Sequence, residues 1–310
     1  MLTLRSYTAA DAATWDAVVE RSRNGNLLHR RAYMDYHADR FLDCSLIVER
    51  KGSAVAVFPA SLHDGVVTSH AGLSYAGLIM TQALGAERTL EVFNLLGEHY
   101  RAHGVQCIVY KAIPHVFHRY PAEEDLYALH RLGASLVRRD VSSVIPLRQP
   151  SSFSPARERA VARARKAGIR LQSGGDPAAF HQLLARVLRR HSAVPTHSLE
   201  ELRLLQARFP GRIVLHEARG DAGLLAGAVT YDFGHVVHTQ YLAASGTGRR
   251  CDALSLLLAE LMGSVYADRA YFSFGISTER GGSVLNTGLA AHKERFGART
   301  VVHDFYEWAL

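Results

Sequence analysis

The stretch VVHTQYLAASGTGRRCDA, residues 236–253, contains the transition on which the interpretation of this chain depends. Apolar and β-branched residues predict a strand over 236–243. The two glycines of Ser245-Gly246-Thr247-Gly248 favour a turn after that strand. From Ala253 to residue 266, the apolar residues predict a helix. The stretch therefore predicts a strand, a glycine turn and a helix in direct succession.

The same order of predicted elements occurs twice along the chain, with matching landmarks roughly 165 residues apart. The first copy has predicted helices at 9–21, 31–38, 86–101 and 124–132, and predicted strands at 44–49, 54–62, 66–73, 105–111 and 141–147. The second copy has predicted helices at 177–190, 199–208, 253–266 and 285–295, and predicted strands at 213–218, 225–233, 236–243, 270–276 and 300–308. Gly65 corresponds to Gly234, and Gly133 to Gly297. We infer a tandem duplication.

A chain of 310 residues exceeds what one hydrophobic core commonly serves, so two domains are expected. Residues 148–154 lie between Pro146 and Pro155 and include Pro150 and Ser151, a composition typical of a linker. The predicted domains are residues 1–148 and 155–310. The expected fold is α/β (α+β), with two tandem units that each have a mixed, mostly antiparallel sheet flanked by helices.

The composition is that of an ordinary globular protein, with 48% hydrophobic and 21% charged residues. The net charge of +7 suits anionic small molecules such as nucleotides or CoA, and it permits nucleic acid without requiring it. We see neither a signal peptide nor a run of membrane-spanning length. Three widely spaced cysteines give neither a disulfide framework nor a metal pair. We therefore expect a cytoplasmic protein without a metal ion.

The order of predicted elements resembles the GNAT acyltransferase unit, and a tandem pair of such units is similar to the FemAB-type transferases. Related acetyltransferase-like proteins of bacterial polysaccharide gene clusters share this resemblance. It covers most of the chain as topology. Its most specific sequence pieces are Phe274-Gly275-Ile276-Ser277, Leu285-Asn286-Thr287-Gly288-Leu289 and Lys293-Glu294-Arg295-Phe296-Gly297.

The glycine turn and the arginines after it are candidates for binding an acyl donor. Glycines permit close backbone approach, first-turn N–H groups suit a phosphate, and arginines add charge-assisted donors. GNAT enzymes hold the CoA pyrophosphate at this junction, so the resemblance implies acetyl-CoA or another acyl-CoA as co-substrate. A plain strand–helix turn is the alternative. The predicted donor-binding residues are Gly246, Thr247, Gly248, Arg249 and Arg250.

Ala243 stands where the family pattern Q/R-x-x-G-x-G/A has its leading residue, which leaves the identity of the donor open. In the first copy, the equivalent place after Tyr75-Ala76-Gly77 has no G-x-G. We therefore expect the first unit to have lost donor binding and to serve the acceptor, while the second unit binds the donor.

His238 and Lys293 are the candidate catalytic residues. Strict alternation along the strand gives two faces, one with His238, Gln240 and Leu242 and the other with Val237, Thr239 and Tyr241. An amine nucleophile must lose a proton, which a histidine accepts near neutral pH. Lys293 with Phe296 resembles a K-x-x-F pattern associated with the transfer centre of FemAB-like enzymes, where a lysine stabilises an oxyanion or binds phosphate. The alternatives are a structural histidine and a solvated cation at a helix end.

Polar residues at the ends of predicted elements are candidates for an acceptor site. They are Tyr36, His37, Arg40, His70, Tyr75 and Lys111 in the first unit, and Gln240 and Asn286 in the second.

The expected function is transfer of an acyl group, with acetyl the simplest, from acyl-CoA to a small-molecule amine such as an amino sugar or a nucleotide-activated amino sugar. One alternative is FemAB-like transfer from aminoacyl-tRNA. Another is a non-catalytic scaffold or sugar-binding protein. A helically spaced stripe favours contact with RNA or a diphosphate, or simply faces solvent. Its members are Arg159, Arg163, Lys166 and Arg170.

Overall fold

The computed structural model describes residues 1–149, 152–190, 192–221 and 223–310. Pro150 and Ser151 of the predicted linker lie outside this description. The chain forms two compact units. Unit 1 comprises Met1–Val141, Thr278–Val284 and Val302–Leu310, and unit 2 comprises Ser142–Ser277 and Leu285–Val301. The predicted domains were two consecutive stretches of the chain, 1–148 and 155–310. The compact units are not consecutive stretches, because the last strand pairs with a strand of unit 1.

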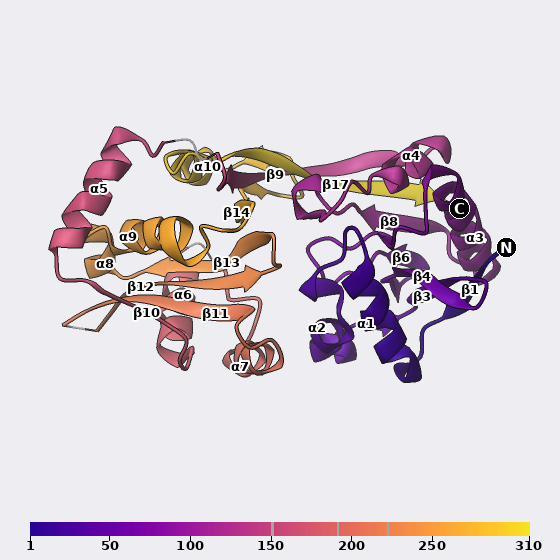
Figure 1. Ribbon diagram of the computed structural model, residues 1–310, viewed down its shortest axis with the longest axis horizontal. Helices are drawn as coiled ribbons and strands as arrows, with labels where there is room; N and C mark the ends of the chain where they lie inside the picture. Colours follow the sequence, from indigo (N-terminus) through magenta and orange to yellow (C-terminus); the bar gives the residue numbers. More distant parts are fainter. Residues whose placement is uncertain (150–151, 191, 222) are drawn as a thin grey trace. The chain divides into compact units, whose positions relative to one another are not determined.

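The strands of unit 1 fall into two groups (Figure 1). The first is a four-stranded antiparallel sheet in the order β1 (Leu2–Ser6), β3 (Leu46–Arg50), β4 (Ser53–Phe58) and β7 (Ile79–Met80). The second has the order β17 (Arg299–Ala309), β8 (Cys107–Lys111), β6 (Val66–Thr68), β5 (Ser61–His63) and β2 (Leu42–Asp43). Strands β6 and β8 are parallel, and β17 pairs antiparallel with β8 from Phe305 to Ala309.

Helix α3 (Ala86–Ala102) shows why the helices of unit 1 form where they do. Val92, Phe93, Leu96 and Tyr100 recur at helical spacing and are all buried, so one face of the helix joins the core. The remaining helical segments are η1 (Ala9–Asp11), α1 (Ala12–Arg21), η2 (Leu27–His29), α2 (Arg31–Met34), η3 (Asp35–Arg40), η4 (His115–Phe117) and α4 (Glu124–Arg131).

Unit 2 is built on one mixed sheet. Its order is β10 (Arg170–Ser173), β11 (Ile213–Gly220), β12 (Gly223–Asp232), β13 (Val236–Ala244), β14 (Tyr271–Ile276) and the part of β9 (Ser135–Pro146) that follows Val141. Strands β13 and β14 are parallel to each other, and β9 pairs antiparallel with β14 through residues Ser142 to Pro146. The helical segments are α5 (Pro155–Lys166), α6 (Ala178–Arg189), α7 (Leu199–Arg208), α8 (Gly246–Arg250), α9 (Ala253–Glu260), η5 (Leu261–Val265) and α10 (Thr287–Glu294).

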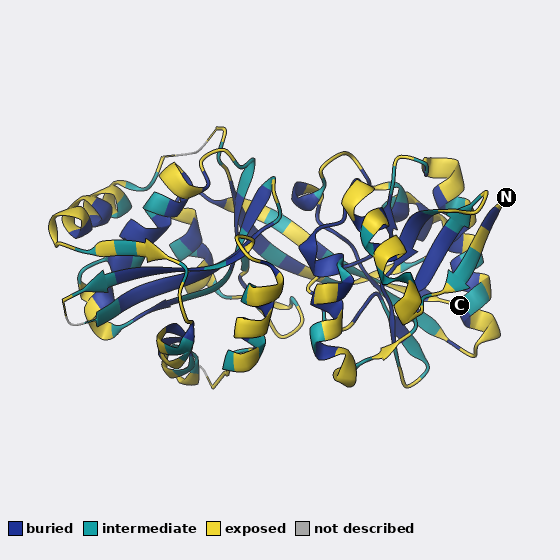
Figure 2. Cartoon of the chain, turned by 60° about the horizontal axis from the view of Figure 1, so that its bottom comes forward, coloured by how far each residue is buried: buried dark blue, intermediate teal, exposed yellow. Residues whose placement is uncertain are grey.

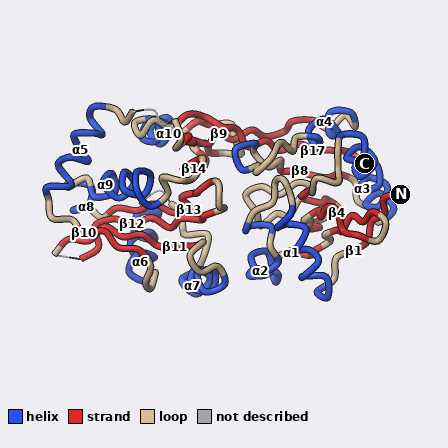
Figure 3. Tube along the Cα trace, viewed as in Figure 1, coloured by secondary structure: helices blue, strands red, loops and turns tan. Residues whose placement is uncertain are grey.

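The core of unit 2 lies between the sheet and α9. Leu257 and Leu258 of α9 share one buried cluster with Ala226, Ala228 and Val237 of the strands. In each unit the helices flank the strands and loops join their ends (Figure 3). Buried residues concentrate on the strands, and exposed residues lie on the outward faces of the helices (Figure 2). A short hairpin, β15 (Thr278–Glu279) with β16 (Val284–Leu285), follows β14.

The predicted α/β fold, with mixed sheets flanked by helices, is confirmed, with local corrections. The strands that were not predicted are β1, β2, β7, β10, β15 and β16. Arg170 lies on β10, so the basic stripe continues along α5 only to Lys166. The strand predicted over 66–73 ends at Thr68, because the chain leaves the sheet before β7.

Within the described ranges, no helix combines the length and apolar character needed to cross a membrane. The same residues hold no cluster of three or more metal-ligating side chains.

Candidate functional site

Strands β13 and β14 of unit 2 run side by side only at their beginnings. Three parallel pairs join them, the last being His238 with Ser273, although β13 continues to Ala244 and β14 to Ile276. Beyond this point, no strand in the described part of the chain pairs with β13 on the side of β14. An open strand edge presents N–H and C=O groups that can bind an extended ligand.

A β-bulge lies at Gln240, just past the point where the strands part. Val229 of β12 pairs with Tyr241 and Thr230 pairs with Thr239, so Gln240 has no partner in this ladder. The extra residue shifts the alternation of side chains. The predicted faces are therefore wrong beyond Thr239: Tyr241 shares the face of His238, and Leu242 shares the face of Thr239.

His238 lies at the vertex of the splayed strands. Its Nδ1 is 3.1 Å from Ser273 Oγ, which holds the half-buried ring in place. Gly275 has a φ of +74°, and a Cβ built there would lie 3.1 Å from His238 Cε1. The glycine therefore leaves room for the imidazole where β14 turns away. A histidine in this place can exchange a proton with a group bound between the strands.

The predicted glycine turn forms the short helix α8, which Ser245 caps by accepting a hydrogen bond from Gly248 N–H at 3.0 Å. A Cβ on Gly248 would lie 2.0 Å from Leu225 O, so only glycine allows this turn to pack on β12. Gly246 is exposed, and a Cβ built on it would lie in ordinary contact with Arg250 Nη1, at 3.7 Å. The two glycines thus differ, since Gly248 fixes the turn and Gly246 leaves its outer side accessible.

Polar groups gather on the outer side of this turn. Thr247, Arg249 and Arg250 are exposed, like Gly246. Arg250 Nη2 donates to Thr247 Oγ1 at 3.0 Å, and Arg249 Nη1 donates to Ala244 O at 3.1 Å. The N–H groups of Gly246 and Thr247 are in the first turn, where a helix supplies no acceptors. Two cations and two such donors suit a phosphate group.

Lys293 is buried in unit 2, with 4% of its surface exposed. Its ammonium donates to Gly275 O at 2.8 Å, Ile276 O at 2.7 Å and Ser277 Oγ at 2.8 Å. Burial lowers the pKa of Lys293 to about 8. The alternative of a solvated cation at a helix end is therefore wrong. Lys293 fixes the end of β14 with all three of its N–H groups.

Asn286 caps α10 beside this lysine. Its Oδ1 accepts from Leu289 N–H at 2.9 Å, and its backbone N–H donates to Ser277 O at 2.8 Å. Asn286 and Lys293 therefore both hold the chain at Ser277, and the structure brings these two predicted residues together.

In unit 1 the structure groups three of the predicted acceptor residues. The ring centroid of His37 is 4.1 Å from that of Tyr36 and 5.5 Å from that of His70. His70 is buried in a left-handed backbone conformation with φ of +52°, and burial lowers its pKa to about 3. Arg40 lies at the exposed end of η3.

Lys111 and Tyr75 are buried and hold the segment that leads from β6 to β7. Lys111 Nζ donates to Leu73 O and, at 3.4 Å, to Ala71 O. Burial is the main cause that lowers the pKa of Lys111 to about 7. The Tyr75 hydroxyl accepts from Asn26 Nδ2 at 3.2 Å, and its ring centroid is 4.7 Å from that of Phe117. The side chains of Lys111 and Tyr75 thus make contacts within the interior of unit 1.

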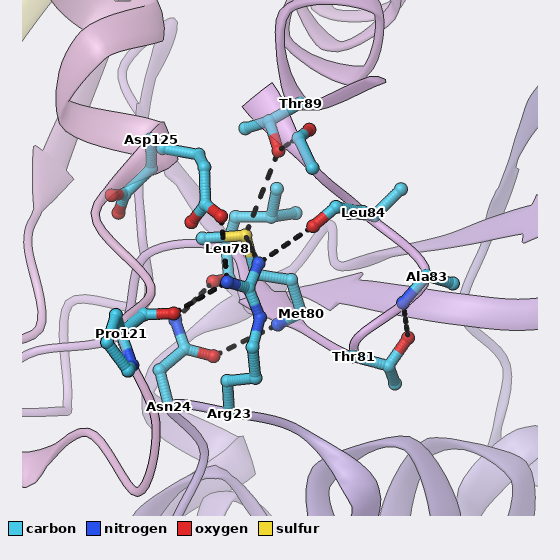
Figure 4. Close-up of polar contacts among 12 residues, drawn as sticks. Arg23, Asn24, Leu78, Met80, Thr81, Ala83, Leu84, Thr89, Pro121 and Asp125 are labelled. Atoms are coloured by element: carbon cyan, nitrogen blue, oxygen red, sulfur yellow. Dashed lines mark hydrogen bonds and ion pairs between the residues drawn. The ribbon is translucent and has the colours of Figure 1, made fainter. Parts of the chain in front are cut away.

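The strand–helix junction of unit 1 is covered by residues that sequence reasoning missed (Figure 4). Arg23 N–H donates to Met80 O at 2.8 Å, Asn24 Nδ2 donates to Leu78 O at 2.8 Å, and Met80 N–H donates to Asn24 Oδ1 at 3.0 Å. Since β4 pairs with the other side of β7, Arg23 and Asn24 occupy its remaining edge.

The guanidinium of Arg23 reaches the start of α3. It donates to Leu84 O at 2.8 Å, Pro121 O at 2.6 Å and Glu124 Oε1 at 2.7 Å (Figure 4). Its side chain is buried. A cation of the protein itself therefore lies at the place in unit 1 that corresponds to the exposed turn of unit 2. In the sequence, Arg23-Asn24 follows a predicted helix and has the composition of an ordinary loop. No sequence pattern therefore indicated that Arg23 covers the junction.

Residues 156–282, which contain the strand, turn and α8 of unit 2, match the family model described as an acetyltransferase (GNAT) domain. The whole chain is similar to the crystal structure of FemX, with 13% identity, a TM-score of 0.72 and coverage of 99% of this chain and 97% of that one. The chain has a GNAT-superfamily fold. The predicted resemblance to FemAB-type proteins is thereby confirmed.

Two further structures share this GNAT fold. A tandem GNAT protein from the clavulanic acid biosynthesis pathway has 13% identity and a TM-score of 0.55, and the similarity covers 100% of this chain and 98% of that one. The C-terminal domain of a putative lysylphosphatidylglycerol synthetase from Agrobacterium fabrum has 12% identity and a TM-score of 0.62, covering 97% and 92%. A search of curated protein sequences finds no match.

Proposed function

We propose that this GNAT-like chain is an N-acyltransferase and that its acyl donor, an acyl-CoA with acetyl as the simplest acyl group, binds to unit 2. The observation that carries the proposal is the open edge of β13 that leads to the exposed turn at Gly246. Unit 1 has the same order of elements, but Arg23 and Asn24 cover its edge. Unit 1 is therefore assigned to the acceptor.

The parts of CoA match this surface in order. Its extended, amide-containing arm would lie along the β13 edge, where backbone groups can bind it. Its diphosphate would meet the N–H groups of Gly246 and Thr247 and the cations of Arg249 and Arg250. The thioester would then lie near His238, where the two strands part.

In the transfer step, the acceptor nitrogen forms a bond to the acyl carbon, and the bond from that carbon to sulfur breaks. The nitrogen loses a proton, for which His238 is the proposed base, and the leaving thiolate gains one. N–H groups on the β13 edge stabilise the oxyanion. Lys293 is proposed to assist by holding Gly275 and Ile276 in place, since its own donors are already used.

The proposed acceptor is an amine on a sugar or nucleotide-activated sugar. The half-buried ring of Tyr36, which is backed by the buried rings of His37 and His70, is proposed to pack on the sugar, and the exposed Arg40 can pair with a phosphate. Gln240 and Asn286, near the proposed transfer centre, are proposed to orient the amine. Tyr75 and Lys111 would support the acceptor indirectly, through the segment they hold.

Transfer from aminoacyl-tRNA is a second candidate, because one surface feature favours it. Arg159 and Lys166 are exposed on α5, and Arg163 pairs with Asp252, two residues after the end of α8, at 2.8 Å. The basic side of α5 therefore lies next to the α8 turn, as an RNA backbone would require. Ala243, in place of the usual Gln or Arg, also leaves the donor open.

Thermal-shift measurements with acetyl-CoA test the proposal, and substitutions at Gly246 make the test specific. An aspartate at the start of a helix stabilises it but repels a phosphate. We expect Gly246→Asp to keep the melting temperature of the free protein and to lose most of the shift caused by sub-millimolar acetyl-CoA. Gly246→Ala, the matched control, should keep the shift.

Three outcomes distinguish the candidates. A shift with acetyl-CoA that Gly246→Asp removes supports the acyl-CoA donor. Salt-sensitive binding of tRNA, without any response to acetyl-CoA, would show that the acyl-CoA hypothesis is wrong and would support an aminoacyl-tRNA donor. If neither binds, the protein is a scaffold or sugar-binding protein and the proposal is wrong.

A further inference from the structure

Ser173 and His216 form a directly opposed pair on β10 and β11 of unit 2. Ser173 Oγ lies 2.7 Å from His216 Nδ1. Ser173 is exposed, whereas His216 is buried, with 2% of its surface exposed. The pair therefore combines an accessible hydroxyl with a shielded imidazole. Neither residue belongs to the proposed donor site.

The hydrogen bonds on the other side of the ring favour one tautomer of His216. Nε2 is 3.0 Å from the Tyr266 hydroxyl and 3.1 Å from Thr230 Oγ1, and these two hydroxyls are 2.8 Å apart. Thr230 Oγ1 also donates to Val214 O at 3.4 Å, since a carbonyl can only accept. Tyr266 then donates to Thr230 and accepts from His216 Nε2–H. This arrangement uses every contact and leaves Nδ1 as the acceptor of the Ser173 proton.

The backbone after Ser173 keeps its hydroxyl accessible. Gly174 and Gly175 have φ values of +86° and +95°, a left-handed conformation that glycine adopts without strain. Gly174 N–H donates to Leu215 O at 2.8 Å and ends the pairing of β10 with β11. β10 is an edge strand of its sheet, so an electrophile can approach Ser173 from solvent.

We propose that Ser173 is a nucleophilic serine that accepts an acyl group from a carboxylic ester or thioester, with His216 as its base and Tyr266 as a positioning residue. A nucleophile, a base and a third group that orients the base are the elements of covalent catalysis by serine. Ser173 Oγ forms a bond to the acyl carbon, and the bond from that carbon to the leaving oxygen or sulfur breaks. The serine proton moves to His216 Nδ1 and from there to the leaving group.

Burial keeps the imidazole neutral at pH 7. Burial lowers the pKa of His216 to about 4, so its Nδ1 is available as a base throughout the neutral range. The nearest acidic groups are already paired with cations, Glu217 with Arg219 at 3.0 Å and Asp232 with Arg269 at 2.8 Å.

Incubation of the full chain with p-nitrophenyl acetate at pH 7 tests the proposal. We expect release of p-nitrophenolate together with an acetyl group on Ser173, located by peptide mass spectrometry. Ser173→Ala should abolish both. The matched control is Ser198→Ala, because Ser198 is also exposed and its Oγ accepts from a backbone group, Glu201 N–H, at 3.1 Å. Equal release from the wild type and Ser173→Ala, with no acetyl on Ser173, would overturn the proposal.

The pH profile separates an active base from a merely structural histidine. With His216 as base, the acetylation rate of Ser173 should be flat from pH 6 to 8. An unassisted hydroxyl would instead react about tenfold faster per pH unit, following its ionised fraction. Tyr266→Phe removes one of the two hydroxyls that contact Nε2–H, leaving Thr230 Oγ1, and should lower the rate about tenfold or more without changing this flat profile. A profile that rises throughout the range would refute the role of His216.

Discussion

The two strand–helix junctions of this molecule have the same place in the order of elements and different surroundings. In unit 2, β13 leads through the Ser245-capped turn into α9, and its edge beyond His238 is open. In unit 1, β7 leads to α3, and Arg23 and Asn24 bind the corresponding edge. The chain itself therefore occupies the strand edge in unit 1 and leaves it open in unit 2. This difference supports the proposal that the donor site is present in unit 2 alone.

A second difference concerns the strand that carries this edge. In unit 2 it is the single strand β13, with one extra residue at Gln240. In unit 1 its counterpart is divided: β6 pairs parallel with β8, as the start of β13 does with β14, and β7 pairs with β4, as the end of β13 does with β12. Residues 69–78 separate the two parts. The same point of the strand therefore holds a bulge in one unit and a ten-residue segment in the other.

The largest expected effect concerns the cation that fills the junction of unit 1. Arg23→Met leaves Glu124 and two carbonyls without their buried partner, so the free energy of unfolding should fall by about 3–5 kcal/mol. Urea unfolding measures this loss. Adding Glu124→Gln should recover part of it, because the uncompensated carboxylate is then removed. A loss below about 1 kcal/mol would mean that Arg23 does not hold this junction closed.

A substitution of His238 tests the role of the open junction in unit 2. His238→Gln removes the proposed base but keeps a side chain that can bond to Ser273, so the rate of acyl transfer should fall about 10²–10³-fold. Binding of acetyl-CoA, measured by calorimetry, should stay within about twofold, because His238 acts on the acceptor proton. An unchanged rate of acyl transfer would mean that His238 has a structural role and is not the base.

Each unit also holds one buried lysine whose pKa is lowered, Lys111 to about 7 and Lys293 to about 8, against 10.5 in the unfolded chain. Between the folded and unfolded values the unfolded chain binds one more proton, so each lysine makes the free energy of unfolding rise with pH. The upper limit is about 1.4 kcal/mol per pH unit.

Urea unfolding at pH 7, 8 and 9 checks this sign. The difference between the wild type and Lys111→Met should grow in favour of the wild type from pH 7, and that for Lys293→Met from pH 8. A difference that stays constant or shrinks over these intervals would show that the lysines keep ordinary pKa values in the folded protein.

The smallest expected effect belongs to the exposed arginines of the turn. Arg249→Gln and Arg250→Gln should each weaken acetyl-CoA binding about three- to tenfold, and less at high salt, because exposed charges are screened. Their stability should not change measurably. Arg186→Gln removes an equally exposed charge from α6 and is the control. If it weakens binding as much, the effect is one of net charge and not of the turn.

The fold was largely predictable, since apolar periodicity and glycine positions report on each element separately. The candidate site was less predictable than the fold, because its geometry depends on contacts between segments that are distant in the sequence. The bulge at Gln240 follows from pairing with β12, and the three bonds of Lys293 depend on where β14 ends. Gly246 and Gly248 look equivalent in sequence, yet only Gly248 packs against Leu225. Arg23 lies about 60 residues before the junction it covers, beyond the reach of any local pattern.

Amide hydrogen exchange with and without saturating acetyl-CoA tests most directly whether the donor binds only to the open junction. We expect slower exchange along residues 239–250 of unit 2 and no change along residues 78–85 of unit 1. Protection of residues 78–85, or none at residues 239–250 while acetyl-CoA is bound, would contradict it.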